Sequence, residues 1–142
     1  QFDVDEIKFF LPLSEKYDVI TGFRIYRYDA VIRCILSWMY NRLCRIVFGI
    51  RVRDIDCAFK LFKRQALQSI EMESRDFFID AEILCKARAK GFSINEMGVK
   101  HFPRRAGRAT VRSSDIPRTL RELTRIWLSI HFPGKKRKAG GG

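Results

Sequence analysis

The stretch HFPRRAGRAT, residues 101–110, contains three arginines, one histidine and one glycine within ten residues. Positive charges this close together repel one another unless an anion lies among them. Arginine offers planar, paired donors that suit phosphate oxygens, and glycine lets the backbone approach a ligand closely. The composition therefore predicts an anion site, and its occupant could be a small-molecule phosphate, a nucleic-acid backbone, a lipid headgroup or only solvent.

A second group of polar residues follows one line of a predicted helix. Residues 30–49 are apolar on nearly every side, except that Arg33, Ser37 and Asn41 recur at every fourth position. Residues four apart on a helix face the same way, so a guanidinium and a hydroxyl on this line can share one phosphate. A solvated surface stripe is the ordinary alternative. Because the rest of the helix is too apolar to be solvated, we expect contact with a phosphate or a membrane.

The net charge of +12 is concentrated towards the C-terminus. Residues 100–142 contain 12 basic and 2 acidic residues, whereas residues 1–99 contain 16 basic and 14 acidic residues. A basic amphipathic helix is predicted at 113–132, with Trp127 and Phe132 near its end and a KKRK cluster after it. Such a helix suits an anionic membrane surface. Nucleic acid is the rival partner, but no helix-turn-helix or RNA-binding signature accompanies the charge.

Helical and strand patterns alternate along the chain, which predicts the α/β class. We expect helices at residues 3–17, 30–49, 65–70, 80–91 and 113–132, and strands at 18–23, 57–64 and 92–103. Pro12 should kink or end the first helix, Gly22 should close the first strand, and Gly91 should cap the fourth helix.

The cysteines and the apolar runs exclude two classes of protein. The four cysteines form no C-x-x-C pair and lie among apolar neighbours, which predicts buried, reduced thiols rather than a zinc site; they are Cys34, Cys44, Cys57 and Cys85. No apolar run approaches the roughly 20 residues that a helix needs to span a bilayer.

Five segments in order resemble the second half of a family 2 glycosyltransferase with a GT-A fold. They read QFDVDEI, YDVITGFR, RxxxSxxxN, VRDIDCAFKLFKR and FFIDAEILCKARAKGFSINEMGVKHFPRRAG. The branch that they resemble most is the polyprenyl- or dolichyl-phosphate sugar synthases, including dolichol-phosphate mannosyltransferases. The resemblance implies an α/β half-domain, a mixed sheet flanked by helices, without the N-terminal nucleotide-binding half. It divides the chain into an acceptor-side half at 1–112, a basic amphipathic helix at 113–133 and a flexible tail at 134–142.

The resemblance implies two groups of phosphate-binding residues. The donor diphosphate would lie against the turn formed by Arg104, Arg105 and Gly107. The phosphate of a lipid acceptor would be received by Arg24, Arg33 and Ser37.

Carboxylates at three places match acidic positions of the family. Asp54 matches an aspartate that precedes a strand, with Asp56 as a second candidate, and Asp80 and Glu82 match an acidic helix start. The resemblance implies that these groups position sugar hydroxyls or act as a general base. From the residues alone, Asp80 is equally an N-cap and Glu82 a partner of the helix dipole. Ala58 stands where the family usually has glycine, and its methyl limits how closely a ligand can approach.

Gln1 matches the last residue of the run Asp-Ala-Asp-Leu-Gln, whose aspartates bind a divalent metal. The resemblance implies that Gln1 adds an amide oxygen to Mg²⁺ or Mn²⁺, with the main ligands upstream of this chain. It also implies that the nucleotide-binding strands are missing, so we expect these 142 residues alone not to catalyse transfer.

The implied function is metal-dependent, inverting transfer of a sugar from a GDP- or UDP-linked donor to a dolichyl or undecaprenyl phosphate. The protein would be cytoplasmic and peripheral, at the cytosolic face of a membrane. Two alternatives stay open: a family 2 glycosyltransferase with a hydroxyl acceptor, and a non-catalytic basic module that binds nucleic acid or membranes.

Overall fold

The predicted α/β class is confirmed by a computed structural model that describes residues 2–25, 31–74, 78–102 and 116–132. The elements, in chain order, are 3₁₀ turns at Val4–Glu6 and Pro12–Glu15 on either side of α1 (Ile7–Phe10), then β1 (Val19–Arg24), α2 (Val31–Phe48), β2 (Lys60–Phe62), α3 (Arg64–Gln68), α4 (Phe78–Ala89), β3 (Ile94–Val99) and α5 (Ile116–His131). Each predicted helix and strand is present, although most are shorter than the sequence pattern indicated.

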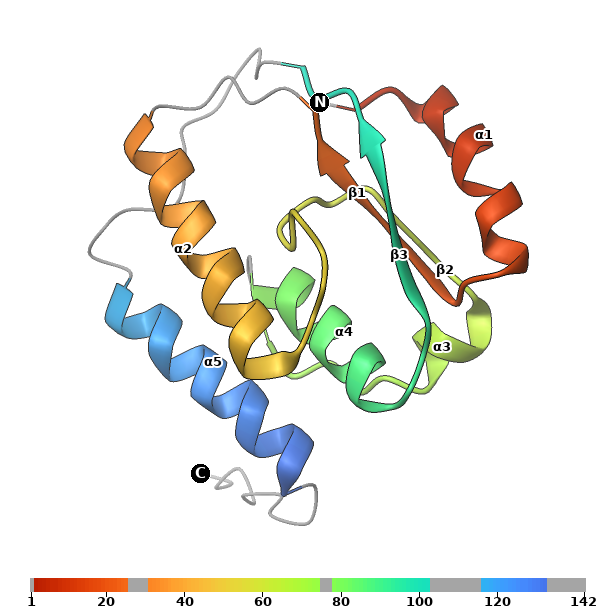
Figure 1. Cartoon of the computed structure of the whole chain (residues 1–142). Helices are drawn as coiled ribbons and strands as arrows, with labels where there is room; N and C mark the ends of the chain where they lie inside the picture. Colours follow the sequence, from red (N-terminus) through yellow and green to blue (C-terminus); the bar gives the residue numbers. More distant parts are fainter. Residues whose placement is uncertain (1, 26–30, 75–77, 103–115, 133–142) are drawn as a thin grey trace, which may run out of the picture.

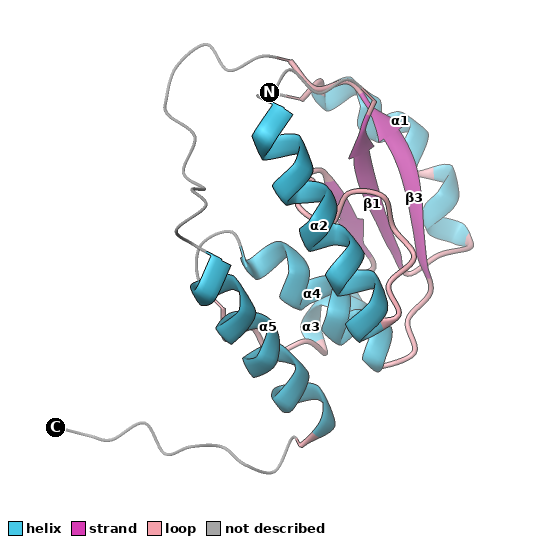
Figure 2. Ribbon diagram, turned by 60° about the vertical axis from the view of Figure 1, so that its left-hand side comes forward, coloured by secondary structure: helices cyan, strands magenta, loops and turns pink. Residues whose placement is uncertain are grey.

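The sheet is mixed, as expected, and its strand order is β2-β1-β3. Val19 of the central strand lies opposite Phe62 of antiparallel β2 and opposite Ile94 of parallel β3. Helix α1 covers one face of the sheet, whereas α2 and α4 cover the other face and α5 packs against these two (Figures 1 and 2). The sheet is therefore enclosed by helices on both sides.

Alternate residues of β1 belong to two hydrophobic cores, because successive side chains of a strand point to opposite faces. Ile20 joins Phe10 of α1 in the smaller core, and Val19 joins the larger core beneath α2, α4 and α5. The cysteines Cys44, Cys57 and Cys85 are buried free thiols, as predicted, and Cys34 is partly buried.

The predicted first helix is broken into three short pieces. Asp3 caps its start by accepting a hydrogen bond from the backbone N of Asp5 at 3.0 Å. The α-helical part ends at Phe10, and Pro12 begins a 3₁₀ turn, because proline cannot donate the next helical hydrogen bond. Gly91 follows the end of α4 with a φ of +84°, which confirms its predicted capping role.

Gly22 does not close the first strand, contrary to the sequence expectation. Strand β1 continues to Arg24, and Gly22 lies inside it. A Cβ atom at this position would come within 2.9 Å of both Cys57 Sγ and Val99 Cγ2. The glycine is therefore required by close packing of neighbouring segments rather than by a turn.

Helix α5 uses part of its apolar face inside the fold. Leu123 and Ile126 are buried in the larger core, whereas Leu120 and Leu128 are exposed. The apolar face that the sequence assigned to a membrane surface is thus partly occupied by the domain itself. None of the described helices combines the length and apolar character that a membrane span requires.

We expect Gly22→Ala to lower the free energy of unfolding by about 2 kcal/mol, because overpacking a tight core typically costs 1–3 kcal/mol. Gly49→Ala is the matched control, since Gly49 has a φ of +67° but nothing within 4 Å of an added Cβ. Gly49→Ala should lower the free energy of unfolding only by the strain of alanine in the left-handed backbone conformation, about 1 kcal/mol. Urea unfolding measures both, and an equal loss in the two variants would contradict the steric explanation.

Candidate functional site

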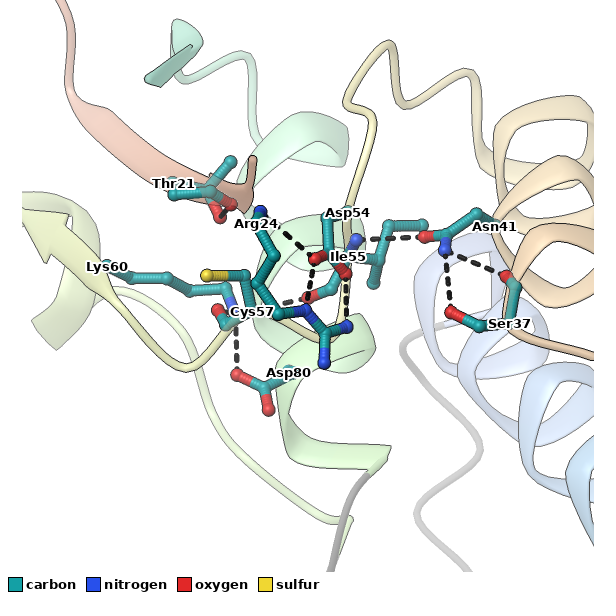
Figure 3. A network of polar contacts seen from close by, with 10 residues as sticks. Thr21, Arg24, Ser37, Asn41, Asp54, Ile55, Cys57, Lys60 and Asp80 are labelled. Carbon is teal, nitrogen blue, oxygen red and sulfur yellow. Dashed lines mark hydrogen bonds and ion pairs between the residues drawn. The ribbon is translucent and has the colours of Figure 1, made fainter. Parts of the chain in front are cut away.

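A buried turn between α2 and β2, residues 53–57, lies at the centre of the candidate site (Figure 3). It contains no helix or strand hydrogen bonds of its own, yet Asp54, Ile55 and Cys57 are buried. Buried backbone groups need partners, and here side chains supply them. Asn41 of α2 accepts from the N of Ile55 at 2.8 Å, and Lys60 Nζ donates to the carbonyls of Ile55 and Cys57.

Arg24, at the end of β1, forms a two-pronged ion pair with Asp54. Its Nε lies 2.6 Å from Oδ2 and its terminal nitrogen 2.8 Å from Oδ1, and both side chains are largely buried. Burial opposes the charge of Arg24, but the hydrogen bonds and charge of Asp54 outweigh it and raise the guanidinium pKa. The structure therefore joins a predicted acceptor-binding residue to a predicted catalytic carboxylate.

Asp80, at the start of α4, is paired with Lys60. Lys60 Nζ lies 2.5 Å from Asp80 Oδ1, and the lysine side chain is only 4% exposed whereas that of Asp80 is 29% exposed. The same ammonium group also donates to the 53–57 turn, so it ties the start of α4 to that turn. Asp80 therefore belongs to the same charged cluster as Arg24 and Asp54, which lie nearby (Figure 3).

Asp56 lies within reach of all four charges of this cluster. Burial, with a further contribution from the charge of Asp54, raises its pKa to about 6, because Arg24 and Lys60 only partly oppose these effects. Its Oδ1 atom is buried and has no hydrogen-bond partner in the described part of the chain. The sequence predicted Asp56 only as a second candidate. In the structure, burial and nearby carboxylates raise its pKa more than Arg24 and Lys60 lower it.

Glu82 lies away from this cluster, in the interior of the molecule. It accepts hydrogen bonds from the backbone N atoms of Glu73 and Ser74 and pairs with Lys86 Nζ at 2.6 Å. Burial opposes its ionisation, but the hydrogen bonds from Lys86 and Ser74 outweigh burial and hold its pKa below the ordinary value. Glu82 thus anchors the loop before α4, and the structure does not bring it to Asp54 or Asp80.

Asn41, the last residue of the polar line on α2, faces inward. Asn41 is 5% exposed and donates to the carbonyl of Ser37 at 2.8 Å and to its hydroxyl oxygen at 3.4 Å. Arg33 lies on the same helix, but its side chain is outside the described part of the structure. The outward face of α2 is mixed, with Val31 76% exposed and Trp38 66% exposed beside the exposed Arg42.

An open groove of about 720 Å³ runs between the end of β1, the 53–57 turn and α2. Its lining combines apolar side chains of α2 with several arginines: Phe23, Arg24, Val31, Cys34, Ile35, Trp38, Asn41, Arg42, Arg45, Arg53 and Asp54. The lining of the groove therefore includes both apolar side chains and arginines.

Sequence reasoning missed three arginines of this groove. Arg53 lies over the ring of Phe23, 4.5 Å from its centroid, and pairs with Glu96 at 2.9 Å. Arg45 donates to the carbonyl of Val52, and Arg42 is exposed. The sequence did hold a signal for them, because Arg42 and Arg45 follow Asn41 closely and Arg53 directly precedes Asp54.

Four predicted site residues lie outside the described residues: Gln1, Arg104, Arg105 and Gly107. Within the described segments, no group of three or more His, Cys, Asp or Glu residues is arranged to hold a metal ion. The predicted metal site and donor-diphosphate turn therefore stay predictions.

Two curated relatives confirm the resemblance to polyprenyl-phosphate sugar transferases. Glycosyltransferase AglD from Haloferax volcanii is 34% identical over 98 residues, covering 64% of this chain and 16% of the relative. Polyprenol monophosphomannose synthase from Mycolicibacterium smegmatis is 24% identical over 87 residues, covering 59% of this chain and 33% of the relative. The chain thus spans a third or less of either relative. No family model and no solved structure matches it.

Replacing Asp56 with asparagine should change how stability depends on pH. Because burial raises the pKa of Asp56 from 3.8 to about 6, the folded state binds its proton more tightly. Stability is therefore lost as pH rises from about 4 to about 6, by up to roughly 3 kcal/mol. Asp56→Asn lacks this loss. The free energy of unfolding of the variant, measured with urea, should therefore increase relative to that of the unaltered protein as pH rises across that range. A constant difference would contradict the raised pKa.

Breaking the Arg24–Asp54 pair should be costly, because one buried charge would lose its partner. We expect Asp54→Asn to lower the free energy of unfolding by about 3 kcal/mol. The double variant Arg24→Met with Asp54→Leu removes both charges and should recover most of that loss. Urea unfolding of the three proteins tests this, and a double variant less stable than Asp54→Asn would show that the pair is not the cause.

Proposed function

We propose, from the resemblance to polyprenyl-phosphate sugar transferases, that this protein transfers a sugar from a nucleotide-sugar donor to a polyprenyl phosphate. In this proposal the chain is the acceptor-side half of a GT-A domain. An acceptor phosphate oxygen bonds to the anomeric carbon as the bond to the donor diphosphate breaks, with inversion at that carbon.

The groove beside α2, whose lining mixes apolar side chains with arginines, is the observation that carries the proposal. A polyprenyl phosphate joins an apolar chain to an anionic head, and a site for it needs an apolar wall beside cationic donors. Val31, Ile35 and Trp38 supply apolar side chains to the lining. Arg42 contributes positive charge, whereas Glu96 neutralises part of the charge of Arg53. Guanidinium groups bind phosphate oxygens through paired hydrogen bonds, which suits this charge to a phosphate head.

The acceptor phosphate is proposed to lie near Arg24, Arg33 and Ser37. Arg24 lines the groove, and Ser37 lies one helical turn before Asn41, which also lines it. Asp54 already neutralises part of the charge of Arg24. The guanidinium of Arg33 is therefore proposed to provide the main charge that binds the phosphate.

The state of the carboxylates favours a phosphate acceptor over a hydroxyl acceptor. Asp54 and Asp80 are each bound to a cation, and Glu82 is buried with its own partners. A phosphate monoester is already anionic near neutral pH, with a second pKa of about 6, so it needs no strong base. Carboxylates that are occupied in ion pairs are consistent with that chemistry.

One observation favours the hydroxyl acceptor as a second candidate. A pKa of about 6 makes Asp56 the candidate whose protonation is best matched to a general base near neutral pH. However, Asp56 is not among the residues that line the groove. Activity that survives in Asp56→Asn would remove this candidate.

The donor side of the proposal depends on residues beyond the described segments. Arg104, Arg105 and Gly107 are proposed to hold the donor diphosphate. Gln1 is proposed to contribute one ligand to Mg²⁺ or Mn²⁺, which would stabilise the charge of the diphosphate when bound. The described residues themselves offer no ligand set for this ion.

An anionic membrane surface is the proposed setting of the reaction. The exposed face of α2 carries Val31, Trp38 and Ile46, with Arg42 on the same face. An apolar helix face with a cation among its side chains suits the boundary between headgroups and acyl chains. The basic residues of the C-terminal third add electrostatic attraction to anionic lipids.

The test is transfer of radiolabel from a panel of nucleotide sugars to a polyprenyl phosphate, using the full-length protein with Mg²⁺ or Mn²⁺. We expect label in the organic phase only when both metal and lipid are present. Arg33→Ala should reduce transfer by about 10- to 100-fold, since a hydrogen bond to a charged group is worth roughly 1.5–3 kcal/mol.

Arg88→Ala is the matched control, because Arg88 is an exposed arginine in the last turn of α4. It should transfer label at the unaltered rate. Absence of lipid-soluble label with every donor would overturn the polyprenyl-phosphate acceptor. Salt-sensitive DNA binding in its place would favour the non-catalytic module.

A further inference from the structure

We propose that Asn41 is a positioning residue for the acceptor phosphate. Its side-chain amide joins Ser37 of α2 to the 53–57 turn and thereby sets the separation between Ser37 and Arg24. This inference rests on the proposed function, because it concerns the same phosphate site, but neither the resemblance nor the relatives assign a role to Asn41.

Asn41 uses both ends of its amide, towards two different segments. Its Oδ1 accepts from the backbone N of Ile55 at 2.8 Å, and its Nδ2 donates to the carbonyl and hydroxyl oxygens of Ser37 (Figure 3). Ile55 directly follows Asp54, whose carboxylate holds the Nε and a terminal nitrogen of Arg24. Hydrogen bonds, together with the peptide bond between Asp54 and Ile55, thus connect Ser37 to Arg24.

No other side chain provides this pair of contacts at the same length. Leucine has a similar size but neither a donor nor an acceptor, and aspartate could accept from Ile55 but could not donate to Ser37. Glutamine carries the same amide on a longer arm. Asparagine is also a poor helix former, so its place inside α2 is not explained by helix propensity.

The consequence concerns geometry at the phosphate. Arg24 comes from the end of β1 and Ser37 from α2, two elements that the chain joins through residues 26–30. Two groups that share one phosphate must keep their spacing within a fraction of an ångström to bind well. Asn41 supplies a link between α2 and the turn that carries Asp54. Loosening it should weaken binding of the phosphate more than binding of the apolar chain.

Binding of farnesyl phosphate and of farnesol to the full-length protein, measured by calorimetry, tests the proposal. We expect Asn41→Leu to weaken the binding of farnesyl phosphate about 10-fold or more and to leave the binding of farnesol nearly unchanged. In a Ser37→Ala background, Asn41→Leu should weaken the binding of farnesyl phosphate by a clearly smaller factor, because the Ser37 hydroxyl that Asn41 positions is already absent.

Two further variants keep the result interpretable. Asn41→Gln retains the amide and should fold even if Asn41→Leu does not, yet it should still weaken the binding of farnesyl phosphate several-fold. Asn95→Leu makes the same change at the other asparagine, which lies on β3 and whose Oδ1 accepts from the backbone N of its neighbour Glu96, and it should bind like the unaltered protein.

The outcomes separate this inference from the proposed function. Unchanged affinity for farnesyl phosphate in folded Asn41→Gln, or equal weakening of phosphate and farnesol, would overturn the positioning role alone. Failure of the unaltered protein to prefer farnesyl phosphate over farnesol would overturn the proposed acceptor and the role of Asn41 with it.

Discussion

The structure around the candidate site depends on one constraint: a turn without secondary structure, residues 53–57, is buried between a helix and a sheet. Backbone groups in such a turn cannot be left without hydrogen bonds. The fold meets this need with side chains from three places, namely Asn41 on α2, Lys60 on β2 and Glu96 on β3. Arg24 on β1 pairs instead with the carboxylate of Asp54. Each of these side chains is thereby fixed, and the charged groups of the site gather around the turn.

The orientation of α2 follows from the same constraint. Because Asn41 must reach Ile55, this position of α2 faces the interior, whereas apolar residues such as Val31 and Trp38 face outward. The helix also buries apolar residues, since Cys44 belongs to the larger core and Tyr40 and Phe48 pack against it, so α2 carries apolar residues on its inner and its outer side. Its outward apolar residues line the groove together with Arg24 and Arg53.

The sequence predicted the elements better than the contacts between them. Periodicity and capping residues are local, so the position of α2, the break at Pro12 and the cap at Gly91 could be read from the chain. The role of Gly22 could not, because the atoms that exclude a side chain there belong to Cys57 and Val99.

The same limit applies to the candidate site. Arg24 and Asp54 were each singled out, but for separate tasks, since no local pattern shows that residues 30 positions apart share an ion pair. Arg53 was overlooked for the same reason, as its partners Phe23 and Glu96 lie on other elements. Pairing changes the chemistry: a carboxylate held by a buried guanidinium is a poor base but a firm support for that guanidinium. The ion pairs around the turn therefore argue against Asp54 and Asp80 as general bases, which agrees with the proposed acceptor, a phosphate that is already ionised.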